Sequence, residues 1–399
     1  MNKFKSWLET YSYIPVAVLF VGLAIYLRLT NLSHPSGDYN QFLQPWMEQI
    51  VANGGWASLG VSIGDYSPPY VLILTWLSYF PKPDSTYPYV YVIKYVSVFF
   101  DVVMAVGVFF LVATLLKSDK ERFWKATLAG TVTLYLPTIF LNSAIWGQAD
   151  SIYTAFIIWS LYLFAKDKHL WAMVVYGVAF SFKLQAIFVV PFLIMMYVLN
   201  RPKQLWHFLV IPVVYFVFCI PALFYGRSLE SLAMIYFNQA GSYKRLSLNM
   251  PNLYVWFPGD IYRYNLLAPL GFGIFALLMA VAFFFLVNKK IRVRKFSIVD
   301  IVLWSVLMAN FFLPAMHERY LFIADVMSWV YYVIKKRHKY VPLMINLISL
   351  IAYFPFLFGI EPIPHEYAAF GYAALLALVT RQVFFDLEET ERAQTSRLA

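Results

Sequence analysis

Apolar stretches long enough to cross a membrane follow one another along almost the whole chain. A transmembrane helix needs about 20 predominantly apolar residues. Twelve stretches approach or reach that length, at 12–28, 88–116, 126–141, 149–165, 170–183, 184–199, 205–225, 264–287, 297–313, 320–334, 340–358 and 367–385. Only 13% of the residues are charged and 61% are hydrophobic, whereas about 25% are charged in a typical soluble domain. These values exclude a soluble enzyme, a disordered chain and a nucleic-acid-binding protein. We therefore predict an all-α polytopic membrane protein with about twelve (about 11 to 13) transmembrane helices.

The basic residues predict how the chain is oriented, because cytoplasmic loops of membrane proteins are enriched in Lys and Arg. Lys3 and Lys5 precede the first span, and no small-residue cleavage site follows it, so we expect an uncleaved first helix. The apolar run 70–80 is too short to cross and is predicted to be an interfacial or re-entrant helix on the outer side. Most of the 31 basic residues then fall on the inner side. Both termini are predicted to be cytoplasmic, in a plasma membrane that the compact length suggests is bacterial.

The chain shows one membrane domain, residues 1–385, with two long outer segments. These segments, 29–87 and 226–263, are rich in Trp, Tyr, Pro and Asn. We expect 226–263 to cover a site and to contribute to acceptor recognition. The acidic end, 386–399, is predicted to be a cytoplasmic tail. Cys219 is the single cysteine, which excludes an intrachain disulfide.

Two carboxylates in the first outer segment are candidates for chemistry. Asp38 begins a segment whose apolar residues recur with helical spacing over 39–50, so the helix should lie in the membrane interface. Asp38 is either a helix N-cap or a general base. Asp65, followed by Tyr66, lies in a turn rich in Gly and Pro, where an Asp is either structural or involved in catalysis or substrate binding.

The segment 142–151 joins two predicted spans on the outer side by a tight hairpin. Trp146 could only anchor the hairpin at the interface, but Gln148 and Asp150 supply hydrogen-bonding groups that could bind sugar hydroxyls. A second outer turn contains Lys183 and Gln185 between two apolar spans. This lysine either extends to the membrane surface or binds an anionic ligand.

Three ionisable residues, His317, Glu318 and Arg319, follow one another at the outer end of the ninth span. Ionisable residues between apolar spans are by default a functional hypothesis, and Arg with His suits a phosphate group. The alternative is a salt bridge between Glu318 and Arg319. Asp101, which shares a helix with Lys94, and Asp325 lie within spans and are expected to pair inside the bundle.

All of these outer groups lie near one predicted membrane surface, with carboxylates and cations both present. Transfer from a phosphate-linked donor needs both. The acceptor hydroxyl must lose a proton as it attacks, and the departing phosphate gains charge that cations can stabilise. The donor's lipid tail would lie in the bilayer.

The order of these motifs resembles that of the GT-C membrane glycosyltransferases. Within this group, the motif order resembles that of the endoplasmic-reticulum glucosyltransferases that extend lipid-linked oligosaccharides. It also resembles that of bacterial proteins related to the second mannosyltransferase of GPI-anchor synthesis. The motifs are Gly37-Asp38-Tyr39, Trp46-Met47-Glu48, Gly64-Asp65-Tyr66 with Pro68-Pro69, Trp146-Gly147-Gln148, Lys183 with Gln185, and His317-Glu318-Arg319.

The resemblance implies inverting transfer of a hexose from a polyprenyl-phosphate donor to an acceptor hydroxyl on the extracytoplasmic face. It implies that Asp38 is the general base, that His317 and Arg319 bind the donor phosphate, and that Lys183 assists. Asn40 stands where some members carry a second carboxylate, so we expect no metal and no cofactor. The acceptor is expected to be a glycolipid, a cell-wall glycan or a protein.

Two other classes of function remain open from the sequence. A transporter or flippase of lipid-linked sugars would place its charged groups near the membrane midplane and would often show paired half-repeats. A polysaccharide polymerase or ligase that uses lipid-diphosphate substrates would share the outer-face cations but would not need a carboxylate base in the first loop.

Overall fold

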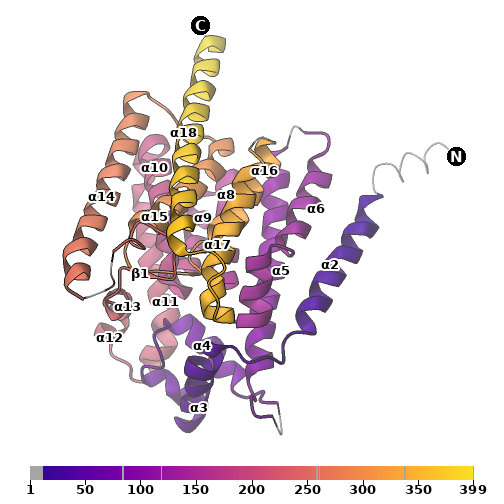
Figure 1. The fold of residues 1–399 in the computed structure, drawn as a ribbon, viewed down its shortest axis with the longest axis vertical. Helices are drawn as coiled ribbons and strands as arrows, with labels where there is room; N and C mark the ends of the chain where they lie inside the picture. Colours follow the sequence, from indigo (N-terminus) through magenta and orange to yellow (C-terminus); the bar gives the residue numbers. More distant parts are fainter. Residues whose placement is uncertain are drawn as a thin grey trace, which may run out of the picture.

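Helices make up 76% of the structure, with almost no strands (Figure 1). The structure is a computed structural model that describes residues 12–398 except 83, 84, 118, 258, 260 and 337. The first half contains α2 (Tyr13–Leu29), η1 (Tyr39–Leu43), α3 (Gln44–Ala52), η2 (Gly55–Gly60), α4 (Pro68–Leu77), α5 (Val90–Leu115), α6 (Arg122–Thr133), α7 (Pro137–Phe140), η3 (Leu141–Trp146), α8 (Asp150–Ala165), α9 (His169–Phe182), η4 (Leu184–Val189) and α10 (Val190–Asn200). The second half contains η5 (Pro202–Leu209), α11 (Val210–Phe224), α12 (Leu229–Ala233), α13 (Ile235–Ser242), β1 (Ser247–Leu248), α14 (Ile261–Asn288), η6 (Lys295–Ser297), α15 (Ile298–Phe312), β2 (Met316–His317), α16 (Phe322–Lys335), α17 (Tyr340–Phe358) and α18 (His365–Leu398).

Every predicted span coincides with a helix or with consecutive helices, which confirms the all-α polytopic class. Among the described residues, five helices are long and apolar enough to cross a membrane: α5, η5 with α11, α14, α17 and the part of α18 up to Glu389. A sixth candidate is α6 followed by α7 and η3, which bends by 50°. Several other apolar helices are 10–17 residues long, so a total of twelve crossings stays a prediction.

The bend between α6 and α7 has a local cause. Pro137 is the first residue of α7, and a proline disfavours helical backbone in the residue before it. Leu136 accordingly has φ −60° and ψ 125°, which is extended backbone. The chain therefore changes direction before it enters η3, the first half of the hairpin that was predicted at 142–151.

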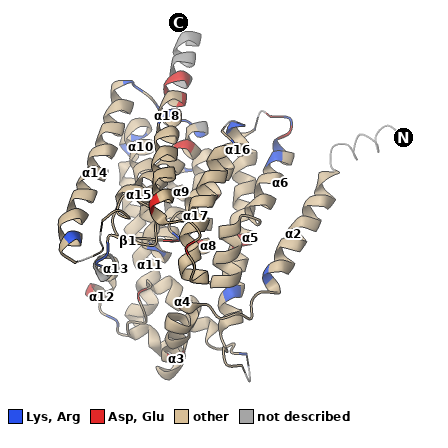
Figure 2. Cartoon of the chain, viewed as in Figure 1, with Lys and Arg blue, Asp and Glu red and all other residues tan. Residues whose placement is uncertain are grey.

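The basic residues gather at one end of the bundle (Figure 2). This is the end where α6 begins and where α14 and α16 finish, whereas α3 and α4 lie at the opposite end. With only 10 residues, α4 spans about 15 Å, which is half of a hydrocarbon core. The charge distribution is the one that the positive-inside rule favours for a membrane protein with α3 and α4 outside.

Parts of the orientation prediction fall on residues that are not described. Lys3, Lys5, Arg337 and residue 399 lie outside the described residues. The rest of the predicted tail at 386–399 is not a separate segment, because α18 continues without a break to Leu398. The sidedness of the two termini stays a prediction.

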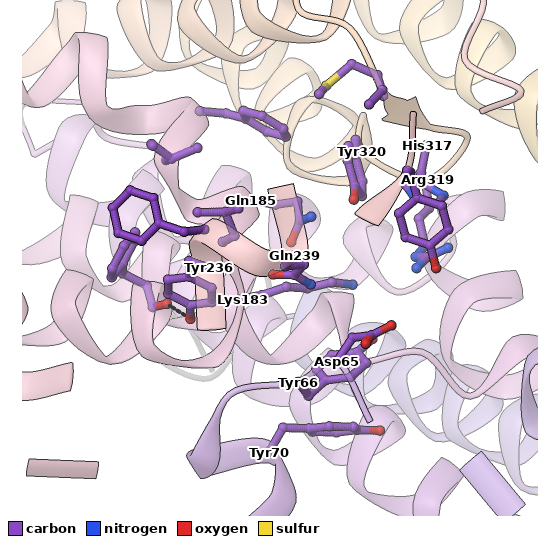
Figure 3. Close-up of a pocket in the computed structure, with 18 of the residues that line it drawn as sticks. Asp65, Tyr66, Tyr70, Lys183, Gln185, Tyr236, Gln239, His317, Arg319 and Tyr320 are labelled. Atoms are coloured by element: carbon purple, nitrogen blue, oxygen red, sulfur yellow. Dashed lines mark hydrogen bonds between the residues drawn. The ribbon is translucent and has the colours of Figure 1, made fainter. Parts of the chain in front are cut away.

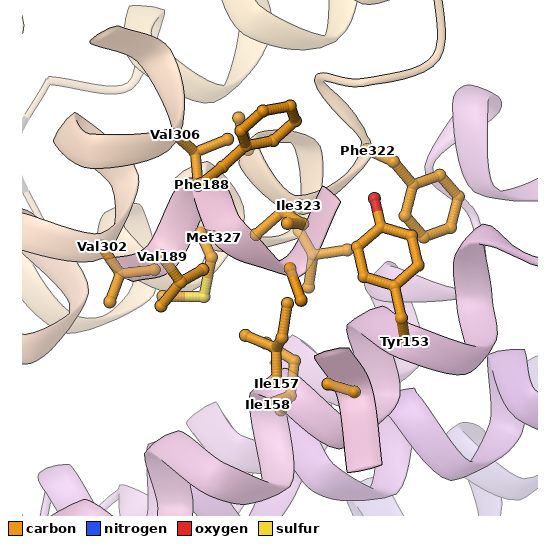
Figure 4. Close-up of a cluster of buried hydrophobic side chains, with 14 of the residues drawn as sticks. Tyr153, Ile157, Ile158, Phe188, Val189, Val302, Val306, Phe322, Ile323 and Met327 are labelled. Atoms are coloured by element: carbon orange, nitrogen blue, oxygen red, sulfur yellow. The ribbon is translucent and has the colours of Figure 1, made fainter. Parts of the chain in front are cut away.

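The large hydrophobic core includes a region where four elements, α8, η4, α15 and α16, meet (Figure 4). A helix that is apolar on all sides is expected to be buried, and α8 fits this pattern because most of its side chains are buried. The residues in the close-up are Tyr153, Ile157 and Ile158 from α8, Phe188 and Val189 from η4, Val302 and Val306 from α15, and Phe322, Ile323 and Met327 from α16. This core fixes the start of α8 relative to the turn at Lys183.

Asp101 and Asp325, which the sequence predicts to pair inside the bundle, do not line the cavity described below, and they differ in their partners. Asp101 pairs with Arg28, whose Nε lies 2.8 Å from Oδ2, rather than with Lys94 on its own helix. Asp325 accepts a hydrogen bond of 2.8 Å from the Ser349 hydroxyl and has no ion pair among the described residues. The expectation of pairing in the bundle thus holds for Asp101, whereas Asp325 is only hydrogen-bonded.

Candidate functional site

A cavity of about 1070 Å³ lies toward the end of the bundle that carries α3 and α4. One part of its wall is polar and contains eight of the predicted site residues besides a glutamine from α13. These are Asp38, Asp65, Tyr66, Gln148, Lys183, Gln185, His317, Arg319 and Gln239. Figure 3 shows Lys183 and Gln239 in the middle of the cavity, His317 and Arg319 on one side, and Asp65 with Tyr66 below.

The Asp38 carboxylate is held from behind by the hairpin. Its Oδ2 accepts a hydrogen bond of 2.9 Å from the Trp146 indole N–H and a second from the Gln148 amide. Its Oδ1 has no hydrogen-bond partner among the described residues, and Asp38 lines the cavity. One oxygen therefore fixes the carboxylate while the other remains able to accept a proton.

The helix-capping interpretation of Asp38 is wrong, because its side chain makes no capping hydrogen bond. Ser36 does this instead, and its Oγ accepts a bond of 3.1 Å from the Tyr39 N–H. The Ser36 hydroxyl also donates a bond of 2.7 Å to the Trp146 carbonyl. A serine two residues earlier thus satisfies the helix start and leaves the carboxylate free for the cavity.

The hairpin brings Trp146 and Gln148 to Asp38 through a left-handed turn. Gly147, between them, has φ 78°, and an added Cβ would lie 3.2 Å from the Lys94 side chain. The Gln148 N–H donates a bond of 3.0 Å to the Asn142 carbonyl, which closes the turn. A residue other than glycine would be strained here in both backbone and packing.

Asp150 lies behind the cavity wall and pairs with both cations that face the cavity. Its Oδ1 lies 2.5 Å from the Lys183 Nζ, and its Oδ2 lies 3.5 Å from the Arg319 Nε. The Asn142 amide donates a further bond of 2.9 Å to Oδ2. Asp150 is fully buried and does not line the cavity, so it orients the two cations from behind.

Glu318 and Trp146 also lie behind the wall, although the sequence placed them among the substrate-binding candidates. The Glu318 Oε1 lies 2.9 Å from the Arg319 Nη1, which is the salt bridge that the sequence left as an alternative. The Arg319 guanidinium lies 5.5 Å from the centre of a Trp146 ring. The Arg319 side chain is therefore fixed by two carboxylates and an aromatic face before any ligand binds.

The His317 imidazole lines the cavity in its neutral form. Burial lowers the pKa of His317 below its usual range, so the ring carries no charge at neutral pH. Burial raises the pKa of Glu318, but its interaction with His317 and the charge of Arg319 bring that pKa below its usual value. The charges on this segment are thus one cation, Arg319, and one anion, Glu318.

Asp65 faces the same cavity from the side of α4. Its side chain is exposed, and it has no hydrogen bond or ion pair with any described residue. Tyr66 beside it packs on Tyr70 with ring centres 4.5 Å apart and on Trp46 at 5.6 Å. The Asp65 carboxylate is therefore a second acceptor in the cavity, placed beside an aromatic surface.

The segment 226–263 covers part of the cavity, through residues that the sequence alone did not single out. Strand β1 pairs in parallel with β2, with Leu248 opposite His317. This pairing places α13 over the cavity, where Tyr236, Gln239 and Tyr243 become part of the lining. No local pattern marks these residues, because two-residue strands far apart in the chain leave no periodicity to detect.

Beyond the polar groups the cavity continues as an apolar surface formed by α9, η4, η5, α11, α13 and α14. Its lining includes Phe180, Ile187, Phe188, Phe208, Ile211, Pro212, Phe216, Phe237 and Phe272. The cavity is therefore amphipathic, with charged groups at one end and a long hydrocarbon surface at the other.

No group of three or more His, Cys, Asp or Glu residues that could hold a metal ion occurs in the part of the chain that the structure describes. Asp38 has Asn40 rather than a second carboxylate near it in sequence. Asp65 is the other carboxylate of the first segment that lines the cavity. Metal independence stays a prediction that a chelator can test.

The chain is an all-helical membrane protein of the GT-C glycosyltransferase type. The chain belongs to glycosyltransferase family 87, whose family model matches residues 65–314. The match includes Asp65, the hairpin and Lys183, whereas Asp38 and His317 to Arg319 lie outside it. Among curated proteins, none matches the chain.

Proposed function

We propose that this glycosyltransferase moves a hexose from a polyprenyl-phosphate donor to an acceptor hydroxyl, with inversion at the anomeric carbon and with Asp38 as general base. The observation that carries the proposal is the arrangement of the cavity. A carboxylate with one free oxygen shares the cavity with two cations, the buried Lys183 and the partly buried Arg319, and an apolar surface continues from them. We place the reaction on the extracytoplasmic face of a bacterial plasma membrane.

The base step follows from the way Asp38 is held. Trp146 and Gln148 donate hydrogen bonds to Oδ2 and fix the orientation of the carboxylate. Oδ1 accepts the proton of the acceptor hydroxyl as its oxygen bonds to the anomeric carbon. The bond from that carbon to the phosphate oxygen breaks at the same time, and the polyprenyl phosphate leaves with the electron pair and an additional negative charge.

Arg319 and Lys183 stabilise the charge that develops on the departing phosphate. A guanidinium has five N–H donors, and Glu318 and Asp150 engage only some of those on Arg319. The two carboxylates hold the cations in place before the donor binds, so little reorganisation is needed as charge develops. Neutral His317 adds one hydrogen-bond donor.

The apolar part of the cavity suits the lipid portion of the donor. Residues such as Phe180, Ile211 and Phe272 give it a hydrocarbon lining, which a polyprenyl chain can cover at a gain of about 0.8 kcal/mol for each buried CH₂ group. The cavity is cationic at one end and apolar at the other, so it fits an amphipathic molecule with a phosphate head and a hydrocarbon tail.

The two competing classes of function are less well supported. Membership of a glycosyltransferase family favours transfer over transport of a lipid-linked sugar. A polymerase or ligase that uses lipid diphosphates would not need a carboxylate base in the first outer segment, whereas Asp38 is held there by two hydrogen bonds. We therefore favour a monophosphate donor.

The function is tested by a transfer assay with the purified protein in lipid. A panel of polyprenyl-phosphate hexoses is offered with glycolipid, cell-wall glycan and peptide acceptors, with and without a chelator. We expect transfer from one monophosphate donor, inversion in the product and no loss of rate with the chelator. Transfer from lipid diphosphates alone, or retention of configuration, would contradict the proposal.

Protonation of His317 should make donor binding depend on pH. The imidazole is neutral at pH 7 because burial lowers its pKa, and a bound phosphate favours the protonated form. Donor affinity should therefore rise as the pH falls from about 7.5 to about 5.5, and His317→Gln should remove this rise. Binding of fluorescent polyprenyl phosphate measures the effect.

The control for this pH experiment is His365→Gln. His365 lies at the start of α18, where it pairs with Glu361 at 3.2 Å and does not line the cavity. This variant should keep the pH response of the wild type. If His317→Gln also kept it, the imidazole would not contact the phosphate.

A further inference from the structure

Helix α5 carries three polar side chains on one face that the transfer step does not use. Lys94, Ser97 and Asp101 follow one another at intervals of three and four residues, which places them on the same side of the helix. Their exposed fractions are 1%, 2% and 0%. None of them lines the cavity, so contact with substrate does not explain them.

Lys94 binds the backbone of the segment that leads to Asp38. Its Nζ donates a hydrogen bond of 2.6 Å to the His34 carbonyl and one of 3.4 Å to the Asn31 carbonyl. Lys94 has no ion pair among the described residues. A buried ammonium is costly unless its hydrogen bonds are made, so this side chain ties residues 31–34 firmly to α5.

The other two residues bind the hairpin that holds the Asp38 carboxylate. The Ser97 hydroxyl donates a bond of 2.8 Å to the Gln148 carbonyl. Asp101 accepts hydrogen bonds from the hydroxyls of Ser143, at 2.5 Å, and Ser151. Three points of the hairpin are thus attached to α5: Ser143 near the beginning of the hairpin, Gln148 within it and Ser151 at its end.

The two attached segments meet at Asp38. Ser36 donates a bond of 2.7 Å to the Trp146 carbonyl, and the Trp146 indole binds the Asp38 carboxylate at 2.9 Å. The hydrogen bonds therefore form a closed ring. It runs from α5 through residues 31–38 to Asp38, back through the hairpin and to α5 again.

We propose that Lys94, Ser97 and Asp101 are positioning residues that hold the Asp38 carboxylate in place by fixing both backbone segments that meet there. This inference rests on the proposed role of Asp38 as the base. Orientation explains why such support matters, since a displacement of about 1 Å can cost about 100-fold in rate.

The test compares kcat, the donor KM and hydrogen exchange in matched variants. Ser97→Ala should lower kcat about 10-fold and Asp101→Asn about 100-fold, with a donor KM within about threefold of the wild type. Amides of residues 142–151 should exchange faster in both variants, because the bonds to α5 are lost. Asp101→Asn leaves the Arg28 charge without its carboxylate. Ser97→Ala removes only a hydroxyl, so the test remains decisive if Asp101→Asn does not fold.

Each variant has a control elsewhere in the bundle. Ser160 is also buried and donates a bond of 2.7 Å to a backbone carbonyl, that of Ala172. Asp300 is also a buried carboxylate in an ion pair, at 2.8 Å from the Lys335 Nζ. Ser160→Ala and Asp300→Asn should leave kcat within about twofold of the wild type if only attachment to the hairpin matters.

The same substitutions in an Asp38→Asn background separate positioning from a general structural effect. If α5 acts through Asp38, Ser97→Ala causes no further loss of the residual rate in that background. An equal loss in both backgrounds, or an unchanged kcat with unchanged exchange of 142–151, would overturn the inference. Near-normal turnover by Asp38→Asn alone would overturn the proposed base, and the exchange data would then still decide whether α5 fixes the hairpin.

Discussion

Asp38→Asn should lower the transfer rate by about 10²- to 10⁴-fold, the usual contribution of a general base, while donor binding stays within about threefold of the wild type. An asparagine has nearly the same shape, and its carbonyl oxygen can still accept the hydrogen bonds from Trp146 and Gln148 that hold the aspartate. The substitution therefore removes proton acceptance and little else. Single-turnover rates and donor titrations measure the two effects separately.

Two other carboxylates of the first outer segment provide controls for Asp38→Asn. Glu48 is exposed on α3 and does not line the cavity, so Glu48→Gln should behave as the wild type. Asp65 lines the cavity without a partner among the described residues. A large loss of rate in Asp65→Asn, with near-normal turnover in Asp38→Asn, would move the role of base to Asp65 and reject our assignment.

Arg319→Gln should weaken donor binding by about 100-fold, which corresponds to about 2.7 kcal/mol. The guanidinium is the cation nearest to His317 in sequence, it lines the cavity, and Asp150 and Glu318 hold it in position. A glutamine cannot supply the charge or the planar set of N–H donors that suits a phosphate. Displacement of fluorescent polyprenyl phosphate measures the loss without requiring a sugar.

The comparison variants for Arg319→Gln separate charge from geometry. Arg319→Lys keeps the charge but loses the paired donors, so we expect an intermediate loss of about 10-fold. Arg227, also in an outer segment, binds Ser62 and Ser231 and does not line the cavity. Arg227→Gln should therefore bind the donor as the wild type does. An unchanged dissociation constant in Arg319→Gln would remove this residue from the phosphate site.

The candidate residues could be selected from the sequence because ionisable groups are rare in so apolar a chain. In a stretch such as 312–320 or 181–185, a charged side chain between two hydrophobic spans is conspicuous whatever the fold. The apolar helix at 70–80 could likewise be recognised from its composition and short length, and its interfacial position stays a prediction. These predictions needed only local information.

The roles of the selected residues within the site could not be read in the same way. Asp150 and Gln148 look alike in sequence as polar groups of one hairpin, yet only Gln148 lines the cavity. Asp150 instead serves as the shared partner of Lys183 and Arg319. Which carboxylate pairs with which cation depends on distances between helices, and the sequence does not contain those distances.

The sequence by itself determined the membrane class, the positions of the apolar helices and the basic end of the bundle. All three follow from the transfer of side chains between water and hydrocarbon, which depends on each short stretch separately. Only the tertiary structure decided that Trp146 binds Asp38 from 108 positions away and that Arg28, rather than Lys94, pairs with Asp101. A buried polar group must find its partner wherever packing brings one within about 3 Å, so those choices belong to the folded chain as a whole.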